Sequence, residues 1–239
     1  MTIGGLQRVS LIDYPEKISA IVFMQGCNFR CPYCYNRELV HPHLFKEPIP
    51  ENEILSLLEH RKGLLEGVVV TGGEPLLQSD LAGFLREVRA MGYRIKLDTN
   101  GSEPDRLERL LENDLVDYIA MDYKAPLRAY RRITGVEIDK ERIVRSIEMI
   151  TGSGLPYEMR TTVYNGLGMS DILDMMMELR SMNVESYFLQ VFKPFSGCNE
   201  DLSPVYLNIE YLYENLMYRF WKYGIRNIKK EAYEYAGHR

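Results

Sequence analysis

The sequence predicts an α/β protein built as a partial, open parallel barrel of about six β/α units. Short apolar segments of strand length alternate with longer segments of helical periodicity along most of the 239 residues. No low-complexity tract, charge block, linker or internal repeat divides the chain. Polar residues stand directly after several of the apolar segments, which is where ligands bind in parallel α/β folds.

Six apolar segments have the length and composition of buried strands. The first runs from Ile18 to Met24, and the second, from Gly67 to Thr71, is a β-branched run that stops at two glycines. The other four expected strands are residues 94–99, 117–121, 158–163 and 187–192. Six strands are fewer than the eight of a closed barrel, so we expect an open one.

The segments between the strands have helical patterns. In residues 51–61 the apolar side chains Ile54, Leu57 and Leu58 share one helical face. Gly92 suits the cap of a helix over 81–91, and Pro104 suits the first turn of a helix over 104–112. The remaining expected helices are residues 140–150, 170–182 and 209–223.

Composition is ordinary for a globular protein, with 46% hydrophobic and 26% charged residues. We expect one domain over residues 1–239, with an N-terminal extension (1–17), a core (18–192) and a C-terminal helical segment (193–239). The net charge of −5 gives no indication of nucleic-acid binding. No signal peptide or membrane span is apparent, so a cytoplasmic protein without a membrane partner is expected.

Three of the four cysteines lie within eight residues, at Cys27, Cys31 and Cys34. Cytoplasmic cysteines rarely form disulfides, so metal ligation is the better interpretation. Three thiolates on a tight loop suit three irons of a cubane cluster and leave the fourth iron open to a substrate. The alternative is a structural zinc, which needs a fourth ligand such as His41, His43 or Cys198.

The polar residues at the other strand ends help to choose between cluster and zinc. Gly72-Gly73-Glu74 follows the second strand, Asp98-Thr99 ends the third, and Asp122 with Lys124 follows the fourth. Each has an ordinary interpretation, as a βα turn, a helix cap or a surface salt bridge worth little. Their occurrence at successive strand ends, after a cysteine loop at the first, favours a ligand site and therefore a cluster.

These features resemble the radical S-adenosylmethionine (SAM) superfamily, whose CxxxCxxC motif has an aromatic before the last cysteine, here Tyr33. The resemblance covers roughly Ile18 to Phe192 and implies a radical SAM core. More narrowly, Gly5 to Pro15 followed by Phe23 to Cys34 is similar to the longer form of the proteins that activate anaerobic ribonucleoside-triphosphate reductase. Those proteins belong with the glycyl-radical-enzyme activases.

The resemblance implies roles for particular residues. Cys27, Cys31 and Cys34 would bind three irons of a [4Fe–4S] cluster, and SAM would chelate the fourth. The cofactor-binding residues implied by the resemblance are Tyr33, Gly72, Gly73, Glu74, Asp98, Thr99, Asp122, Lys124 and Arg160. The two glycines would meet the amino group of SAM, and the strand-end positions would surround its methionine end. Some of those positions also hold a monovalent cation in the pyruvate formate-lyase activase.

The implied reaction is one-electron reduction of the cluster, cleavage of SAM to a 5′-deoxyadenosyl radical, and removal of a hydrogen from a glycine of a partner enzyme. The implied partners are an anaerobic ribonucleotide reductase and a flavodoxin or ferredoxin electron donor. The alternatives are an activase of the pyruvate formate-lyase type, a radical SAM enzyme with a small-molecule substrate, and a zinc-stabilised binding module without catalysis.

The chain departs from the family pattern at three places. Tyr35 stands where many relatives have histidine after the last cysteine. No histidine occurs at residues 192–194, where the pyruvate formate-lyase activase has one. Cys198 lacks a CxxC partner, so no second cluster is expected.

Overall fold

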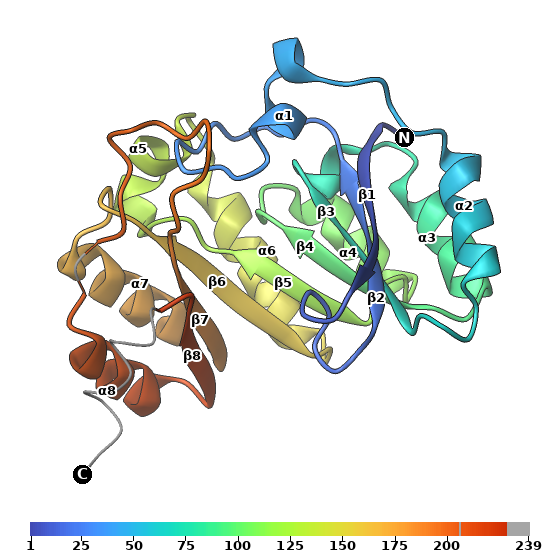
Figure 1. Cartoon of the computed structure of the whole chain (residues 1–239). Coiled ribbons are helices and arrows are strands. Elements are labelled where there is room, and N and C mark those ends of the chain that lie inside the picture. Colours follow the sequence, from blue (N-terminus) through green and yellow to red (C-terminus); the bar gives the residue numbers. More distant parts are fainter. Residues whose placement is uncertain (206, 229–239) are drawn as a thin grey trace.

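The protein forms a single curved eight-stranded sheet with helices on its outer side, as seen in a computed structural model that describes residues 1–205 and 207–228 (Figure 1). Strand order in the sheet equals order in the chain. The first strand runs antiparallel to the second, and all later neighbours are parallel. The strands are β1 (Ile3–Ser10), β2 (Ser19–Met24), β3 (Gly67–Gly72), β4 (Arg94–Thr99), β5 (Tyr118–Asp122), β6 (Tyr157–Val163), β7 (Ser186–Val191) and β8 (Lys222–Arg226).

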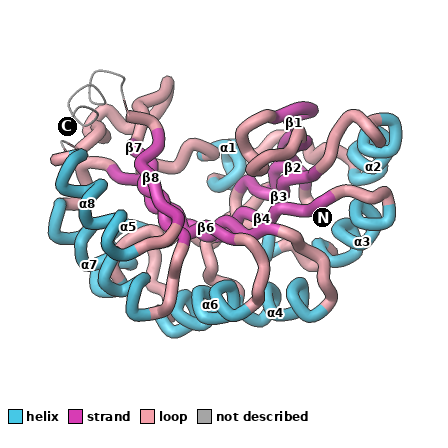
Figure 2. The backbone as a smooth tube through the Cα atoms, turned by 90° about the horizontal axis from the view of Figure 1, so that it is seen from below, coloured by secondary structure: helices cyan, strands magenta, loops and turns pink. Residues whose placement is uncertain are grey.

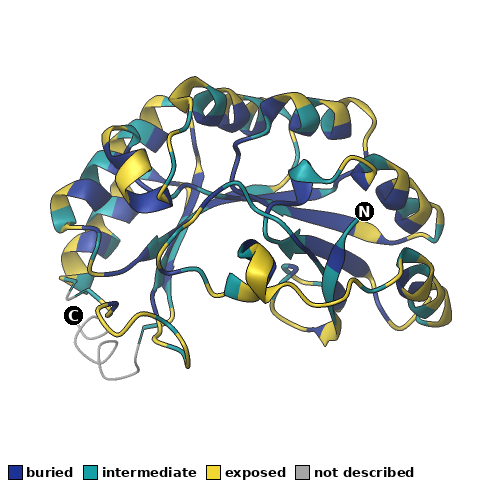
Figure 3. Cartoon of the chain, turned by 90° about the horizontal axis from the view of Figure 1, so that it is seen from above, coloured by how far each residue is buried: buried dark blue, intermediate teal, exposed yellow. Residues whose placement is uncertain are grey.

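The longer helices form an arc around the convex side of the sheet (Figure 2). They are α2 (Glu51–His60), α3 (Leu81–Ala90), α4 (Pro104–Glu112), α6 (Lys140–Gly152), α7 (Met169–Ser181) and α8 (Ile209–Arg219). The shorter helices are α1 (Arg37–Val40), α5 (Tyr130–Thr134), η1 (Pro42–Leu44), η2 (Pro75–Leu77) and η3 (Leu127–Ala129). The short α1 lies on the concave, open side of the sheet (Figures 2 and 3).

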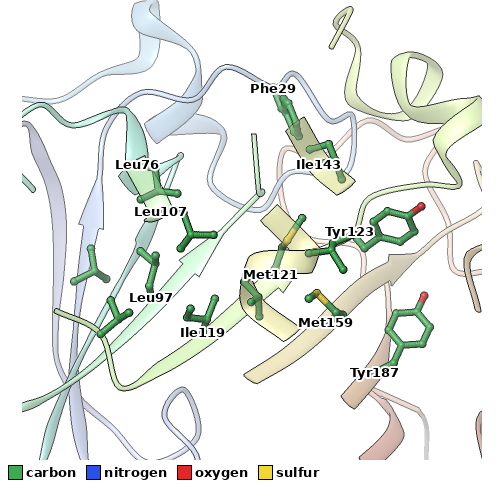
Figure 4. Close-up of a cluster of buried hydrophobic side chains, with 14 of the residues drawn as sticks. Phe29, Leu76, Leu97, Leu107, Ile119, Met121, Tyr123, Ile143, Met159 and Tyr187 are labelled. Atoms are coloured by element: carbon green, nitrogen blue, oxygen red, sulfur yellow. The ribbon is translucent and has the colours of Figure 1, made fainter. Parts of the chain in front are cut away.

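Each long helix buries one face against the sheet and exposes the other (Figure 3). In α6 the buried residues Ile143, Ile147 and Ile150 recur at helical spacing, and the Asp139 side chain caps the helix by accepting from the Glu141 N–H. Figure 4 shows Ile143 and Leu107 pointing into the same core as Leu97 and Met159 of the sheet. The main core therefore lies between sheet and helices.

A smaller apolar group lines the concave side of the sheet and consists of Tyr14, Ile21, Val69, Tyr118 and Ala120. Tyr14 comes from the β1–β2 connection and packs its ring 6.0 Å from that of Tyr118. A Cβ built on Gly67, the first residue of β3, would lie 2.8 Å from the Tyr14 ring. Because Tyr14 fills the end of the concave face where the parallel strands begin, space for a ligand remains at their carboxyl ends.

The predicted open parallel sheet is confirmed, and the six expected strands correspond to β2–β7. Two strands were not expected. The helix predicted over residues 209–223 ends at Arg219, and Lys222–Arg226 then forms β8. Likewise β1 lies within the segment interpreted as an N-terminal extension. Of the segment 193–239, predicted to be helical, residues 206 and 229–239 lie outside the described residues.

Both unexpected strands lack an apolar run. In β1 two glycines and the partly buried Leu6 precede three consecutive exposed residues, and in β8 only Ile225 is buried. Strand formation there depends on pairing with β2 and β7, which a local pattern does not reveal.

None of the helices in the described ranges has the length and apolarity needed to cross a membrane.

Candidate active site

A cavity lies at the carboxyl ends of the strands, and almost all of the predicted site residues line it. Every predicted site residue except Glu74 lines this cavity. Further lining residues, not predicted, are Phe29, Tyr35, Asn36, Val40, Thr71, Asn100, Thr162 and Gln190. The carboxyl ends of β2 to β7 therefore meet there, as the parallel topology requires.

The cysteine loop follows β2 and is fixed at several points. The Gly26 N–H donates to the Leu39 carbonyl (2.7 Å), and the Arg30 N–H donates to the Thr134 carbonyl (2.7 Å). The Arg30 guanidinium also donates to the Cys27 carbonyl (2.6 Å). These bonds hold the loop across the barrel mouth, from the end of β2 to the end of α5.

The three thiols are free and partly buried. Burial raises the pKa of Cys27 to about 12, and it also raises the pKa values of Cys31 and Cys34, while the charge of Lys124 opposes these shifts. Thiolates at these positions therefore need a positive partner. Within the described residues, no three His, Cys, Asp or Glu side chains are arranged to share one metal ion.

Gly72 and Gly73 are required by the packing of the protein itself. Gly72 has φ +118°, and a Cβ there would overlap the Met24 backbone. A Cβ on Gly73 would overlap the Gly26 carbonyl, and the Gly73 N–H donates to the Met24 carbonyl (2.9 Å). The two glycines thus let the loop after β3 pack against the start of the cysteine loop, while both still line the cavity.

Glu74, predicted from the sequence to be a cofactor-binding residue, has a fully buried side chain and is not among the residues that line the cavity. It accepts hydrogen bonds from the Thr99 hydroxyl (2.8 Å) and from the N–H groups of Asn100 (2.6 Å) and Leu76 (3.0 Å). Burial raises its pKa to about 7, although these three bonds oppose the shift. Glu74 therefore joins the loop after β3 to the end of β4.

A chain of alternating charges crosses the strand ends. Lys96 pairs with Asp98, Arg160 bonds both Asp98 (3.2 Å) and Asp122 (2.9 Å), and Lys124 bonds Asp122 (2.9 Å). Burial opposes ionisation of Asp122, but the charges of Arg160 and Lys124 hold its pKa well below the usual range. Burial lowers the pKa of Lys124, but the negative charge of Asp122, together with Cys31 and Cys34, raises it above its ordinary value. Asp122, Lys124 and Arg160 are therefore ionised at neutral pH.

Three polar groups in the cavity wall lack a complete protein hydrogen bond within the described parts of the chain. Thr162 and Gln190 are cross-strand neighbours on β6 and β7, and their side chains make no hydrogen bond there. The Tyr33 hydroxyl is buried close to the Cys31 thiol but without complete hydrogen-bond geometry, and its ring packs on Tyr164 with centroids 4.6 Å apart. Sequence reasoning missed Gln190, although a polar residue near the end of an apolar strand was a usable signal.

Tyr35 connects the cysteine loop to the segment after β7. Its hydroxyl accepts from the Lys193 N–H (2.8 Å), and its ring packs against Phe192 and Phe195 with centroids 5.6 and 5.1 Å away. The position that departs from the family pattern therefore forms part of the cavity rim. Cys198 is not a lining residue of this cavity.

Comparison with known sequences identifies relatives of this chain. Residues 21–179 match the Radical SAM superfamily. A Methanocaldococcus jannaschii protein named as a glycyl-radical enzyme activating enzyme is 33% identical over 206 residues, which is 83% of each chain. The pyruvate formate-lyase-activating enzyme of Clostridium pasteurianum is 31% identical over 56% of this chain and 57% of its own length. A Thermococcus kodakarensis protein named as a GTP 3′,8-cyclase is 28% identical over 86% of this chain and 70% of its own.

Solved structures show the same fold at low sequence identity. Streptococcus suis SuiB bound to its precursor peptide SuiA superposes with a TM-score of 0.67 at 13% identity, over 91% of this chain and 54% of SuiB. Escherichia coli QueE superposes with a TM-score of 0.58 at 16% identity, over 95% of this chain and 94% of QueE. At these identities the likeness establishes the fold alone.

Proposed function

Because the chain belongs to the radical SAM superfamily, we propose that this enzyme activates a glycyl radical enzyme, with an anaerobic ribonucleotide reductase as its target. Enzymes of this superfamily use a [4Fe–4S] cluster and SAM. The observation that carries the proposal is the relative named as a glycyl-radical enzyme activating enzyme, whose similarity extends over 83% of both chains. The ribonucleotide reductase is favoured by the N-terminal segment from Gly5 to Pro15.

The residues around the cavity suit a [4Fe–4S] cluster held by Cys27, Cys31 and Cys34. Their thiols lie on one fixed loop in an environment that disfavours uncompensated thiolates, and iron supplies the compensating charge. The buried hydroxyl of Tyr33, without a complete hydrogen bond, leaves a donor available beside the same loop. When bound, the cluster supplies the electron that cleaves SAM to methionine and a 5′-deoxyadenosyl radical.

The strand-end charges suit the methionine end of SAM. Lys124 and Arg160 can bind its carboxylate, while Asp98 and Asp122 can accept from its ammonium group or hold a monovalent cation. Gly72, Gly73 and Thr99 bring backbone and hydroxyl groups to the same wall. Glu74 acts in this proposal as a positioning residue, since it fixes the loops that carry Gly73 and Thr99.

The protein must also keep water from a reactive primary carbon radical. The strand order leaves β1 and β8 as the edges of the sheet, so no strand pairing closes the barrel between them. A glycine-bearing loop of the partner can enter this side and cover the cavity. A reduced flavodoxin or ferredoxin would supply the electron.

The test is electron paramagnetic resonance on the reconstituted enzyme mixed with SAM, a reductant and an anaerobic ribonucleotide reductase from the same source. A glycyl radical doublet on the reductase is the expected result. SAM cleavage without that doublet would reject the reductase as target. The similarity to the pyruvate formate-lyase-activating enzyme makes another glycyl radical enzyme the next candidate, and the similarity to GTP 3′,8-cyclases makes a small-molecule substrate the one after it.

A further inference from the structure

Basic side chains surround the outer surface of the cysteine loop. Arg30 and Lys193 are exposed, and Arg37 is half-buried. His41 and His43 lie beside them with ring centroids 5.7 Å apart. Partial burial lowers the pKa of His41, and the charges of Arg30, Arg37 and His43 lower it further. These three side chains therefore lie close enough to His41 to act on its charge. We call these five residues the basic rim.

The three permanent charges of the basic rim are not neutralised by the protein. Within residues 1–205 and 207–228, Arg30, Arg37 and Lys193 make no ion pair. Arg30 and Arg37 donate only to backbone carbonyls. By contrast, Arg131 and Arg132 of the neighbouring α5 pair with Glu137 and Asp171.

This surface is positive although the whole chain carries a net charge of −5. Glu38 lies between Arg37 and His41, and Glu200 and Asp201 follow Lys193 in the chain, but within the described residues none of these carboxylates forms an ion pair with Arg30, Arg37 or Lys193. A positive patch on an acidic protein is a feature that attracts an acidic partner to one place.

The basic rim also lies directly over the proposed cluster ligands. Arg30 donates to the Cys27 carbonyl (2.6 Å), and the charge of Arg37 acts on Cys34. Pro32, between two of the cysteines, is exposed. An electron arriving at this surface would therefore enter the protein next to the loop that carries the three thiols.

We propose that the basic rim is the docking surface for an acidic electron-transfer protein carrying a flavin or an iron–sulfur cluster. One electron passes from the reduced donor to the enzyme's cluster, so the donor is oxidised and the cluster reduced by one electron, and no bond is formed or broken. The inference rests on the radical SAM chemistry alone and does not depend on the identity of the glycyl radical partner.

Charge steering suits such a complex, because electron-transfer encounters bury little area, commonly under about 1,200 Å². A few unpaired cations can then set much of the association rate. The other candidate occupants fit less well. An anionic small molecule needs an enclosed site, and Arg30, Arg37 and Lys193 do not line the cavity. The side proposed for entry of the glycyl radical partner is a different one, the open side between β1 and β8.

The experiment measures anaerobic reduction of the cluster in the holoenzyme by stopped-flow absorbance, with reduced flavodoxin as the acidic donor and photoreduced deazaflavin as a small reductant. The variants are Lys193→Glu, Arg37→Glu and their combination. The control is Arg180→Glu, an exposed charge reversal in the last turn of α7. Because α7 leads into β7, Arg180 lies near the end of the sheet opposite the cysteine loop.

The double variant should lower the second-order rate with flavodoxin at low salt about tenfold or more, and the rate should become less sensitive to added salt. Arg180→Glu should leave it unchanged, and all variants should be reduced by deazaflavin at the wild-type rate. An unchanged flavodoxin rate, or an equal loss with both reductants, would overturn the proposal.

Lys193→Glu keeps the test valid if Arg37→Glu loses its cluster, because the Lys193 side chain makes no contact that the fold requires. Failure of wild-type SAM cleavage with deazaflavin would count against the radical SAM function itself.

Discussion

In the cavity wall, the Lys124 Nζ lies 2.9 Å from the Asp122 Oδ2. The Arg160 guanidinium pairs with the other oxygen of the same carboxylate. Lys124→Ala therefore leaves no unpaired carboxylate, and folding should be little affected. If Lys124 binds the SAM carboxylate, its loss removes a charge-assisted contact worth about 1.5–3 kcal/mol. Titration calorimetry should then show affinity for SAM reduced roughly ten- to a hundredfold. Asp122→Ala should weaken binding similarly.

Thermal melts of the same variants separate binding from stability. An unchanged affinity combined with a strongly lowered melting temperature would mean that the Asp122–Lys124 pair is structural.

The raised pKa of the buried Glu74 carboxyl predicts that the stability of the protein depends on pH. The folded-state pKa of Glu74, about 7, exceeds the ordinary 4.5, so the folded state binds the proton more tightly than the unfolded state. The resulting stabilisation is present below pH 4.5 and is lost as the pH rises towards 7. In urea unfolding of the cluster-free protein, the free energy of unfolding should fall between pH 5 and 7 by on the order of 2 kcal/mol more in wild type than in Glu74→Gln. Parallel pH profiles for the two proteins would refute this assignment.

The cysteines provide a third prediction for single residues. Cys27→Ser, Cys31→Ser and Cys34→Ser should each abolish stable cluster binding, because serine is a poor iron ligand and three ligands leave no redundancy. Cys198→Ser should retain both cluster and activity, since Cys198 does not line the cavity. Iron and sulfide analysis of the purified proteins is the measurement. Full iron content in the three single variants would remove the basis of the assignment.

Among single residues, those projecting from strand ends were predictable and those oriented by neighbouring loops were not. Asp98, Asp122 and Arg160 line the cavity because parallel strands end at one edge. Glu74 follows the same rule in sequence, yet it turns away from the cavity to meet Thr99 and two backbone N–H groups. That orientation depends on the partner loop, which is distant in the chain.

At the scale of elements, the contact between the loop after β3 and the cysteine loop depends on the absence of a side chain at Gly73. Gly73→Ala places a Cβ against the Gly26 carbonyl, a backbone atom that a rotamer change does not move. We expect a loss of about 1–3 kcal/mol in unfolding free energy, typical of overpacking, and reduced iron incorporation. Urea unfolding and iron analysis measure both effects.

Gly83→Ala is the matched control, because a Cβ at this position in α3 meets nothing within 4 Å. Alanine is a better helix former than glycine, so this variant should gain about 0.5–1 kcal/mol. Equal stability changes in the two variants would mean that the close loop contact is unimportant.

The same contrast between local and distant determinants explains which elements were predictable. The strands β2, β3 and β5 carry apolar runs that indicate burial on both faces of the sheet, and β4 and β6 have apolar residues in alternation with polar ones. The two edge strands do not, because β1 is exposed at Gln7–Val9 and β8 follows an aromatic helix closely. Periodicity therefore extended the last helix to residue 223, although pairing with β7 turns Lys222–Arg226 into a strand.

Considered as a whole, the molecule provides a cavity with one open side. Tyr14 fills the end where the parallel strands begin, the cysteine loop crosses the opposite end, and β1 and β8 remain unpaired with each other. A radical formed in this cavity needs a partner to exclude solvent. Cleavage of SAM should therefore be productive only when the partner covers the open side.

This dependence can be measured with isotopes. A partner enzyme carrying glycine deuterated at Cα should transfer deuterium to 5′-deoxyadenosine, with close to one glycyl radical formed for each SAM cleaved. Without the partner, 5′-deoxyadenosine should form more slowly and contain no deuterium, because its hydrogen then comes from solvent components or protein. Mass spectrometry of the nucleoside and spin quantitation of the partner provide both numbers. Product without deuterium in the presence of the partner would show that the radical is quenched elsewhere, and the open side would then need a different occupant.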